Sequence, residues 1–246
     1  MRSRAYSSAL CEMVAILMTT LALALTPQLL RRPIEMGRSP HRWCRLYGRP
    51  RMSLGQPPPD EAETEAVKRT LDWLDGFIIQ HQICPFAAPV RRHTRVVVCH
   101  ADDATSCLRR ELDLLREVDA SSPATTLVVT PWLSEFADLM DLQERVEAMA
   151  SSDEAAPIVQ VLAFHPRAAF EHPHDAADFS MRSPLPMLHL LRDDDVVEAE
   201  RQWAQQHAPG PVPGIQERNA ALLRGMGYDK VAELVRQCER PRSGAM

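Results

Sequence analysis

The segment RSPLPMLHLLRDDD, residues 182–195, places two prolines before an apolar run that contains a single histidine. A proline at the first position of a helix loses no hydrogen bond, because the first amides of a helix have no partner within it. We therefore expect a helix from Pro186 to Arg192. At about 100° per residue, its methionine and leucines would form one packed face. His189 would lie opposite that face, toward either solvent or a cleft, with Arg192 on its flank.

The segments on either side of this run alternate between helical and strand patterns. The spacing of apolar residues predicts helices over 63–80, 102–118 and 131–150 and strands over 94–100, 124–131 and 157–166. Further helices are expected over 195–206, 215–226 and 228–237. Because helices between strands favour parallel pairing, we expect an α/β or α+β fold. It would have a small, mainly parallel sheet of three or four strands, helices packed on it and a helical C-terminal part.

Three polar residues follow the predicted strands, namely His100, Thr130 and His165. In an open parallel sheet, ligands bind beyond the carboxyl ends of the strands. Parallel strands would bring these three residues to one edge, whereas an antiparallel pair would scatter them.

Charge is distributed unevenly along the 246 residues. The net charge is −5, but residues 1–56 hold nine arginines and only two acidic residues, so residues 57–246 carry a formal charge of −12. An acidic body repels phosphate backbones, which argues against a nucleic-acid partner. The six cysteines form no CxxC pair, so they indicate neither a zinc knuckle nor a disulfide framework.

Residues 1–56 have the composition of a targeting leader. Arg2 and Arg4 precede an apolar run over 13–25, and Ala22-Leu23-Ala24 fits a signal cleavage site. That run is too short to span a membrane, which needs about 20 residues. The Arg-rich stretch that follows is typical of a transit peptide, so the whole resembles the two-part leader of plastids. Mitochondrial import and secretion stay open, and residues 57–246 are expected to form one globular domain without a membrane span.

Two residues have the chemistry of a catalytic centre. His165 directly follows a buried strand, where it could act as a general base or complete the strand with a hydrogen bond. Cys84 follows a predicted helix end and lies near Arg91 and Arg92 in sequence. Nearby cations would lower the pKa of its thiol, whereas a helix C-terminus would raise it. A buried cysteine acting as a small hydrophobe is the alternative.

The other candidates are polar residues near the opening segment and in the helix expected over 215–226. Arg182 and Arg218 would suit a carboxylate or phosphate. Asn219 lies on the core face of its helix, so it must find a hydrogen-bond partner as a clamp or as a site residue. The loop residues His172, His174 and Asp175 look like a metal motif, but such loop pairs are common without a metal.

Four stretches carry a resemblance to a known family. ICPFA (83–87), QVLAFHP (160–166), RSPLPMLHLLR (182–192) and IQERNAALLRGMG (215–227), in this order, resemble Domain of Unknown Function family 1415, an uncharacterised and largely bacterial family. The similarity spans about residues 62–228. Family members usually have an Asn where this chain has Met181. The resemblance implies that the motif positions here are Cys84, His165, Arg182, Ser183, His189, Glu217, Arg218 and Asn219.

These residues lead to two hypotheses of different class. In the first, the protein is an enzyme acting on a small anionic metabolite: His165 is the acid or base, Cys84 a nucleophile, and Arg182 and Arg218 clamp the anion. Ser183 and Asn219 would add ligand contacts, while His189 and Glu217 orient or titrate. A variant makes Cys84, His165, His189 and Glu217 a metal site, although no spacing selects it. In the second, the protein binds a small molecule without catalysis. The sequence selects no cofactor and no oligomeric state, and a purely structural module also stays open.

Overall fold

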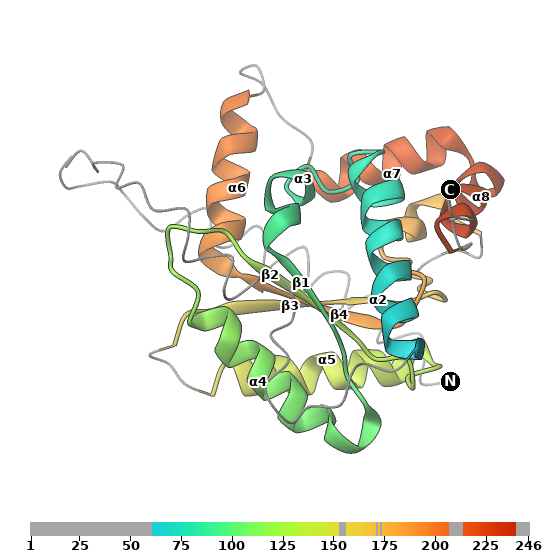
Figure 1. Ribbon diagram of the computed structural model, residues 1–246. Coiled ribbons are helices and arrows are strands. Elements are labelled where there is room, and N and C mark those ends of the chain that lie inside the picture. Colours follow the sequence, from blue (N-terminus) through green and yellow to red (C-terminus); the bar gives the residue numbers. More distant parts are fainter. Residues whose placement is uncertain (1–60, 153–155, 171, 173, 207–213, 240–246) are drawn as a thin grey trace, which may run out of the picture. The chain divides into compact units, whose positions relative to one another are not determined.

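The computed structural model describes residues 61–152, 156–170, 172, 174–206 and 214–239 (Figure 1). Apart from Phe170 and His172, these residues belong to one compact unit. The targeting leader predicted over residues 1–56, including its signal cleavage site and its transit-peptide stretch, lies outside the described residues. Within the described ranges, no helix is both long enough and apolar enough to cross a membrane.

The elements formed by the described residues are mostly helical, with four strands among them. In order they are α2 (Glu61–Trp73), the π-helical η3 (Leu74–Ile79), α3 (Ala87–Val90), η4 (Arg91–His93), β1 (Thr94–Val98), η5 (Ala101–Asp103), α4 (Ala104–Arg116), β2 (Thr125–Val129), α5 (Phe136–Ala150), β3 (Val159–Phe164), η6 (Ala176–Ser180), β4 (Met187–Arg192), α6 (Asp193–Gln206), α7 (Ile215–Met226) and α8 (Tyr228–Glu239). The predicted mixed α/β fold with a four-stranded sheet and a helical C-terminal part is confirmed.

The helix expected over 186–192 is wrong, because residues 187–192 form the central strand β4. Both faces of β4 are covered, so Met187, Leu188 and Leu190 are all fully buried. A strand buried on both faces is apolar throughout instead of alternating. Such a run cannot be told from a buried helix by its period, and its length of six residues is typical of a strand. Arg192, expected on a helix flank, is buried and donates to the carbonyl oxygen of Val118 at 3.0 Å.

The sheet has the order β1-β2-β4-β3 and is mostly antiparallel. β1 and β2 are parallel, whereas β4 pairs antiparallel with both β2 and β3. The expectation of a mainly parallel sheet is therefore wrong in this respect. The physical reason is β4, which enters directly from a loop and runs back between two strands that share a direction.

Helices cover both faces of the sheet. α4 and α5 pack on one face, below the sheet in Figure 1. On the other face, Trp73 and Phe77 from α2 and η3 form a core with Leu127, Met187 and, from α8, Val231. Alternate strand residues point to opposite faces, so β4 contributes Met187 to this core and the next residue along to the α4–α5 side.

One edge of the sheet collects the carboxyl ends of three strands. Because β4 is antiparallel to both of its neighbours, β1, β2 and β3 run in one direction, and their ends at Val98, Val129 and Phe164 lie at this edge. His100, Thr130 and His165 therefore follow strands that end together, despite the antiparallel pairing. The backbone amide of Thr130 donates to the oxygen of Pro186 at 2.8 Å, and α5, expected from residue 131, begins only at Phe136.

Candidate functional site

The loop that carries Cys84, residues 80–86, has one unusual backbone feature just before it and another within it. It is preceded by the π-helical turn η3, a geometry that is rare and frequent at functional sites. Within the loop, Gln82 has a φ of 53°, in the left-handed region that non-glycine residues seldom adopt. We call residues 80–86 the Cys84 loop. Strained backbone persists only where surrounding contacts enforce it, which directs attention to what holds this loop.

Two side chains from the start of α7 hold the Cys84 loop. The Nη2 of Arg218 donates to the carbonyl oxygens of Gln82 and of Ile83, the latter at 3.2 Å. The Nδ2 of Asn219 donates to the same Ile83 oxygen at 2.7 Å, and its Oδ1 accepts from Arg218 at 2.7 Å. The buried Asn219 is thus a polar clamp whose amide is paired at both ends. These bonds fix the backbone immediately before Cys84.

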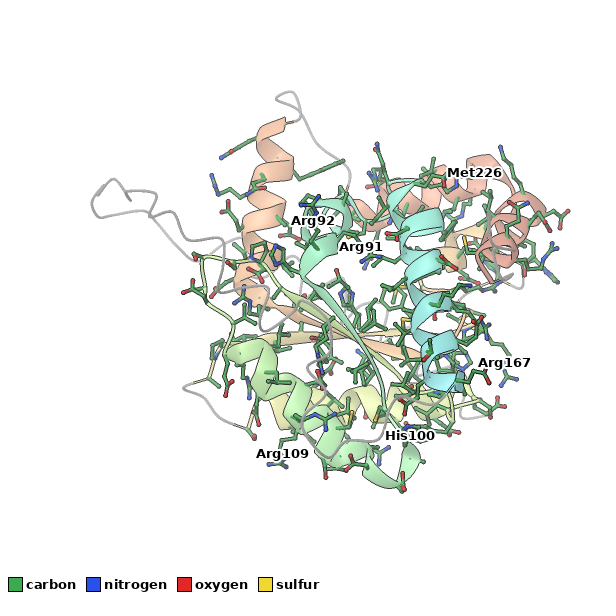
Figure 2. The ribbon with its side chains drawn as sticks, viewed as in Figure 1. Arg91, Arg92, His100, Arg109, Arg167 and Met226 are labelled. Carbon is green, nitrogen blue, oxygen red and sulfur yellow. The ribbon has the colours of Figure 1, made fainter. Side chains whose placement is uncertain are left out.

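The Cys84 sulfur lies among donors but in a desolvated place. The backbone amides of Phe86 and Ala87 and the guanidinium of Arg218 all lower the pKa of its thiol, while burial raises it by more. The pKa therefore lies above its ordinary value, and Cys84 is a thiol at neutral pH. Arg91, expected to be the activating cation, instead pairs with Asp75 at 2.5 and 2.8 Å. Figure 2 shows Arg91 and Arg92 beside α3.

Arg218 is partly buried. Its guanidinium carbon lies 5.2 Å from the ring centroid of Trp203 on α6, and that ring meets Phe86 edge-on at 6.4 Å. Burial lowers the pKa of Arg218, and proximity to Cys84 acts the other way. Its Nε is buried and has no hydrogen-bond partner within the described part of the chain. Glu217, the preceding residue, is exposed. The Nε–H group of Arg218, beside the Cys84 thiol, is therefore a buried donor that makes no hydrogen bond within the described residues.

His165 closes the end of β3. Its side chain is buried, and its Nδ1 accepts a hydrogen bond from the backbone amide of Arg167 at 3.0 Å. The proton is therefore on Nε2, which donates to the carbonyl oxygen of Leu133 at 3.3 Å. Burial lowers the pKa of His165 below its ordinary value. Both ring nitrogens of this neutral imidazole are occupied by backbone groups.

Arg182 and Ser183 support the chain that leads into β4. The Nε of Arg182 donates to the oxygen of Ala168 at 2.8 Å and its Nη1 to the hydroxyl of Tyr228 at 3.0 Å. The guanidinium also lies 4.5 Å from the centroid of the Phe179 ring. The hydroxyl of Ser183 donates to the oxygen of Leu185 at 2.6 Å. These contacts connect η6, α8 and the β3–β4 connection.

His189 lies in the middle of the sheet, on β4. Its Nε2 is 2.5 Å from the hydroxyl of Thr125, which donates its own proton to the oxygen of Leu190 at 2.9 Å. The Nε2 of His189 is therefore the donor in that pair. The ring is 6.0 Å from Phe164, and burial lowers its pKa to about 4. His189 is neutral at physiological pH.

The structure brings three of the eight predicted residues together, Cys84, Arg218 and Asn219, with Glu217 exposed beside them. The contacts of His165, Arg182 and Ser183 lie around the β3–β4 connection, and His189 lies within the sheet. Among the described residues, no group of three or more His, Cys, Asp or Glu side chains is arranged to hold a metal ion. A groove of about 440 Å³ on the outer face of α4 is lined by residues between Thr105 and Glu117 and by none of the eight.

The sequence did not indicate that an aromatic side chain, Trp203, packs against the site. Trp203 contacts Arg218 from a helix that approaches only in the fold. Its segment, RQWAQQ, has no motif that points to a cation. Likewise, the amides of Phe86 and Ala87 became visible as sulfur donors only once the turn into α3 was known.

Fold and site together define a mixed α/β domain with a clamped cysteine–arginine loop. The chain belongs to the family described as Protein of unknown function (DUF1415), whose model matches residues 65–233. The resemblance placed at about residues 62–228 is therefore confirmed. No curated protein and no solved structure matches the chain.

Proposed function

We propose that this protein is an enzyme acting on a small anionic molecule, with Cys84 as nucleophile and Arg218 as the anion-holding group. One observation carries the proposal: the buried Nε of Arg218 has no hydrogen-bond partner within the described residues, next to the Cys84 thiol. Buried polar groups are normally hydrogen-bonded, so an orphaned cationic donor needs an explanation. A carboxylate or phosphate oxygen is the acceptor that a guanidinium matches best.

The surroundings of Cys84 suit a thiolate that forms only when it is needed. At rest, burial keeps the proton on the sulfur. Once the proton leaves, the amides of Phe86 and Ala87 and the charge of Arg218 stabilise the anion that attacks. In this proposal Asn219 positions the loop, and His165, Arg182 and Ser183 support the framework around β4.

A non-catalytic binding protein is the second candidate, and the raised pKa of Cys84 favours it. A cysteine that stays protonated at neutral pH is a poor nucleophile. In that case the anion would bind to Arg218 and no bond to sulfur would form.

Thermal shift with a panel of inorganic phosphate, sulfate and small mono- and dicarboxylates tests the anion site. We expect at least one anion to raise the melting temperature of the full chain, and Arg218→Gln to abolish that rise. Asn219→Ala is the matched control, because it loosens the same loop and keeps the charge. If no anion stabilises the wild-type chain, or if Arg218→Gln responds as fully as the wild type, the proposal is wrong.

Turnover of the stabilising anion separates the two candidates. If the protein is an enzyme, the wild-type chain should convert the ligand, and Cys84→Ala should bind the ligand without converting it. A ligand that the wild-type chain binds and leaves unchanged would identify a binding protein.

We also propose that residues 1–56 direct the protein to a plastid. The basic start, the short apolar run and the Arg-rich stretch support this address. A fluorescent fusion carrying residues 1–56, expressed in a plastid-containing cell, should accumulate in the plastid. Fluorescence in mitochondria or in the medium would contradict it.

A further inference from the structure

A pair of cysteines, separate from Cys84, lies between the sheet and α4. Cys99 follows β1, and its amide donates to the oxygen of Val129 at 2.8 Å, so its backbone extends the β1–β2 ladder. Cys107 is on the buried face of α4. Both side chains are buried, at 0% and 3% exposure. The Cys99 sulfur lies 3.9 Å from the carbonyl oxygen of Ala104, in the turn of α4 that precedes Cys107, and each thiol shifts the pKa of the other. Side chains on a helix lean toward the preceding turn, so the Cys107 sulfur points to the same turn of α4 that the Cys99 sulfur contacts. An S–S bond of ~2.05 Å could join two sulfurs in this arrangement.

The two sulfurs have different surroundings. The Nη2 of Arg110 lies 3.6 Å from the Cys107 sulfur, and together with the Cys99 thiol it lowers the pKa of Cys107. The Cys99 sulfur instead faces carbonyl oxygens, those of His100 at 3.8 Å and Ala104 at 3.9 Å. The neighbouring Cys107 and burial raise the pKa of Cys99. Cys107 therefore has the character of the attacking thiolate and Cys99 that of the partner that keeps its proton.

A small oxidant has a route to Cys107. The side chain of Arg110, which contacts the sulfur, is 49% exposed. Arg110 also forms an ion pair with Glu111 at 3.3 Å. The carboxylate of Glu111 pairs with Arg95 as well. Arg110 therefore covers one side of the Cys107 sulfur with a side chain that itself reaches solvent.

We propose that Cys99 and Cys107 form a reversible disulfide when the protein meets a peroxide. The Cys107 thiolate attacks one peroxide oxygen, the O–O bond breaks, and Cys107 becomes a sulfenic acid while hydroxide leaves. The Cys99 sulfur then attacks the Cys107 sulfur, the S–O bond breaks, and the hydroxyl leaves as water with the Cys99 proton. In sum, two thiols and one hydrogen peroxide give one disulfide and two waters. A dithiol reductant reverses the change.

Peptide mapping of the full wild-type chain tests the pairing without any substitution. The reduced protein is treated with hydrogen peroxide, unfolded in the presence of an alkylating agent and digested. We expect a peptide pair that joins Cys99 to Cys107, about 2 mass units lighter than the two thiols, and its disappearance after dithiothreitol. Cys238 is the internal control, because it is buried and its sulfur donates to the oxygen of Leu234 in its own helix, at 3.4 Å. Full alkylation of both Cys99 and Cys107 after peroxide would overturn the proposal.

Two substitutions test the order of the steps. In Cys99→Ser the partner sulfur is absent, so we expect a sulfenic acid at Cys107 that dimedone traps. Arg110→Gln should slow disulfide formation by about threefold or more, because the thiolate loses its cation. Arg109→Gln, an exposed neighbour on the same helix, is the matched control and should react at the wild-type rate. Equal rates for the two arginine variants would overturn the assignment of Cys107 as the attacking sulfur.

Discussion

At the scale of the residue, His189 is a titratable side chain on the central strand β4, on the same face of the sheet as Met187. Its Nε2 proton is committed to Thr125, and its surroundings offer no charge to balance a second proton. The cause of its low pKa is burial alone, so the neutral form is the one the fold selects.

This ring should make the free energy of unfolding depend on pH. Unfolded His189 takes up a proton near pH 6.5, whereas in the folded protein its pKa is about 4. The unfolded state therefore binds more protons between these values, and stability falls as the pH drops through this window. The contribution is about 2 kcal/mol lost from pH 7 to pH 5. Urea unfolding of wild type and His189→Leu at both pH values should show a decrease that is larger in the wild type by this amount.

His165 serves as the internal reference for that comparison, because it is present in both proteins and its pKa is also lowered. A decrease from pH 7 to pH 5 that is the same in wild type and variant would contradict the assignment to His189.

Single residues were predictable where a local rule applied. A polar residue on the core face of a helix must be paired, and this rule correctly indicated that Asn219 would have a partner. The partner itself, Ile83, is 136 positions away, and no local rule reaches that far. The same distance in sequence hid the approach of Arg218 to Cys84 and made Arg91, a neighbour in sequence, the natural but wrong candidate.

At the scale of the element, β4 determines the arrangement of the sheet. As a central strand it donates and accepts backbone hydrogen bonds on both sides, to β2 and to β3. A proline can donate none of these, whereas in the first turn of a helix it would cost nothing.

Leu188→Pro should therefore destabilise the protein far more than Leu188→Ala. Both variants lose a fully buried leucine side chain, and the alanine variant measures that loss. The excess for proline reports the backbone alone and should be at least about 3 kcal/mol. Equilibrium unfolding of the two variants gives the difference. Equal destabilisation would favour the helical interpretation of this segment over the strand.

The three strands bounded by clear turn signals, and the helices between and after them, followed from the sequence. β4 did not, because a run that is apolar on both faces has no period to distinguish strand from helix. The proline pair before it fits a helix start equally well. With β4 assigned wrongly, the direction of pairing was also wrong, since a strand that enters from a loop without a crossover helix can run antiparallel.

At the scale of the whole unit, Arg182 joins parts that are distant along the chain. Its guanidinium contacts the oxygen of Ala168 after β3, the carboxylate of Asp178 at 3.6 Å in η6, and the hydroxyl of Tyr228 in α8. It thereby couples the C-terminal helices to the connection that feeds β4.

Arg182→Lys should loosen this coupling although the charge is retained. A lysine ammonium cannot reproduce the planar set of donors or the stacking on Phe179. We expect a loss of about 2–4 kcal/mol in the free energy of unfolding and faster amide hydrogen exchange in η6 and α8. Tyr228→Phe removes one of these bonds and should cost about 1 kcal/mol. Unchanged exchange in both elements of the lysine variant would contradict this role.

The place of β4 in the sheet also has a kinetic consequence during synthesis. Its partners in β2 are more than sixty positions earlier, with Thr125 opposite Leu191, and β3 has no other neighbour to pair with. A ribosome must therefore synthesise the chain as far as residue 192 before this central strand exists. Until then β2 and β3 each expose an unpaired edge, the kind of surface on which nascent chains aggregate. Such non-local pairing also slows folding, because the entropy of closing the long loop is lost before the strand contacts that compensate for it can form. We expect chaperone dependence to end abruptly once residue 192 has left the exit tunnel.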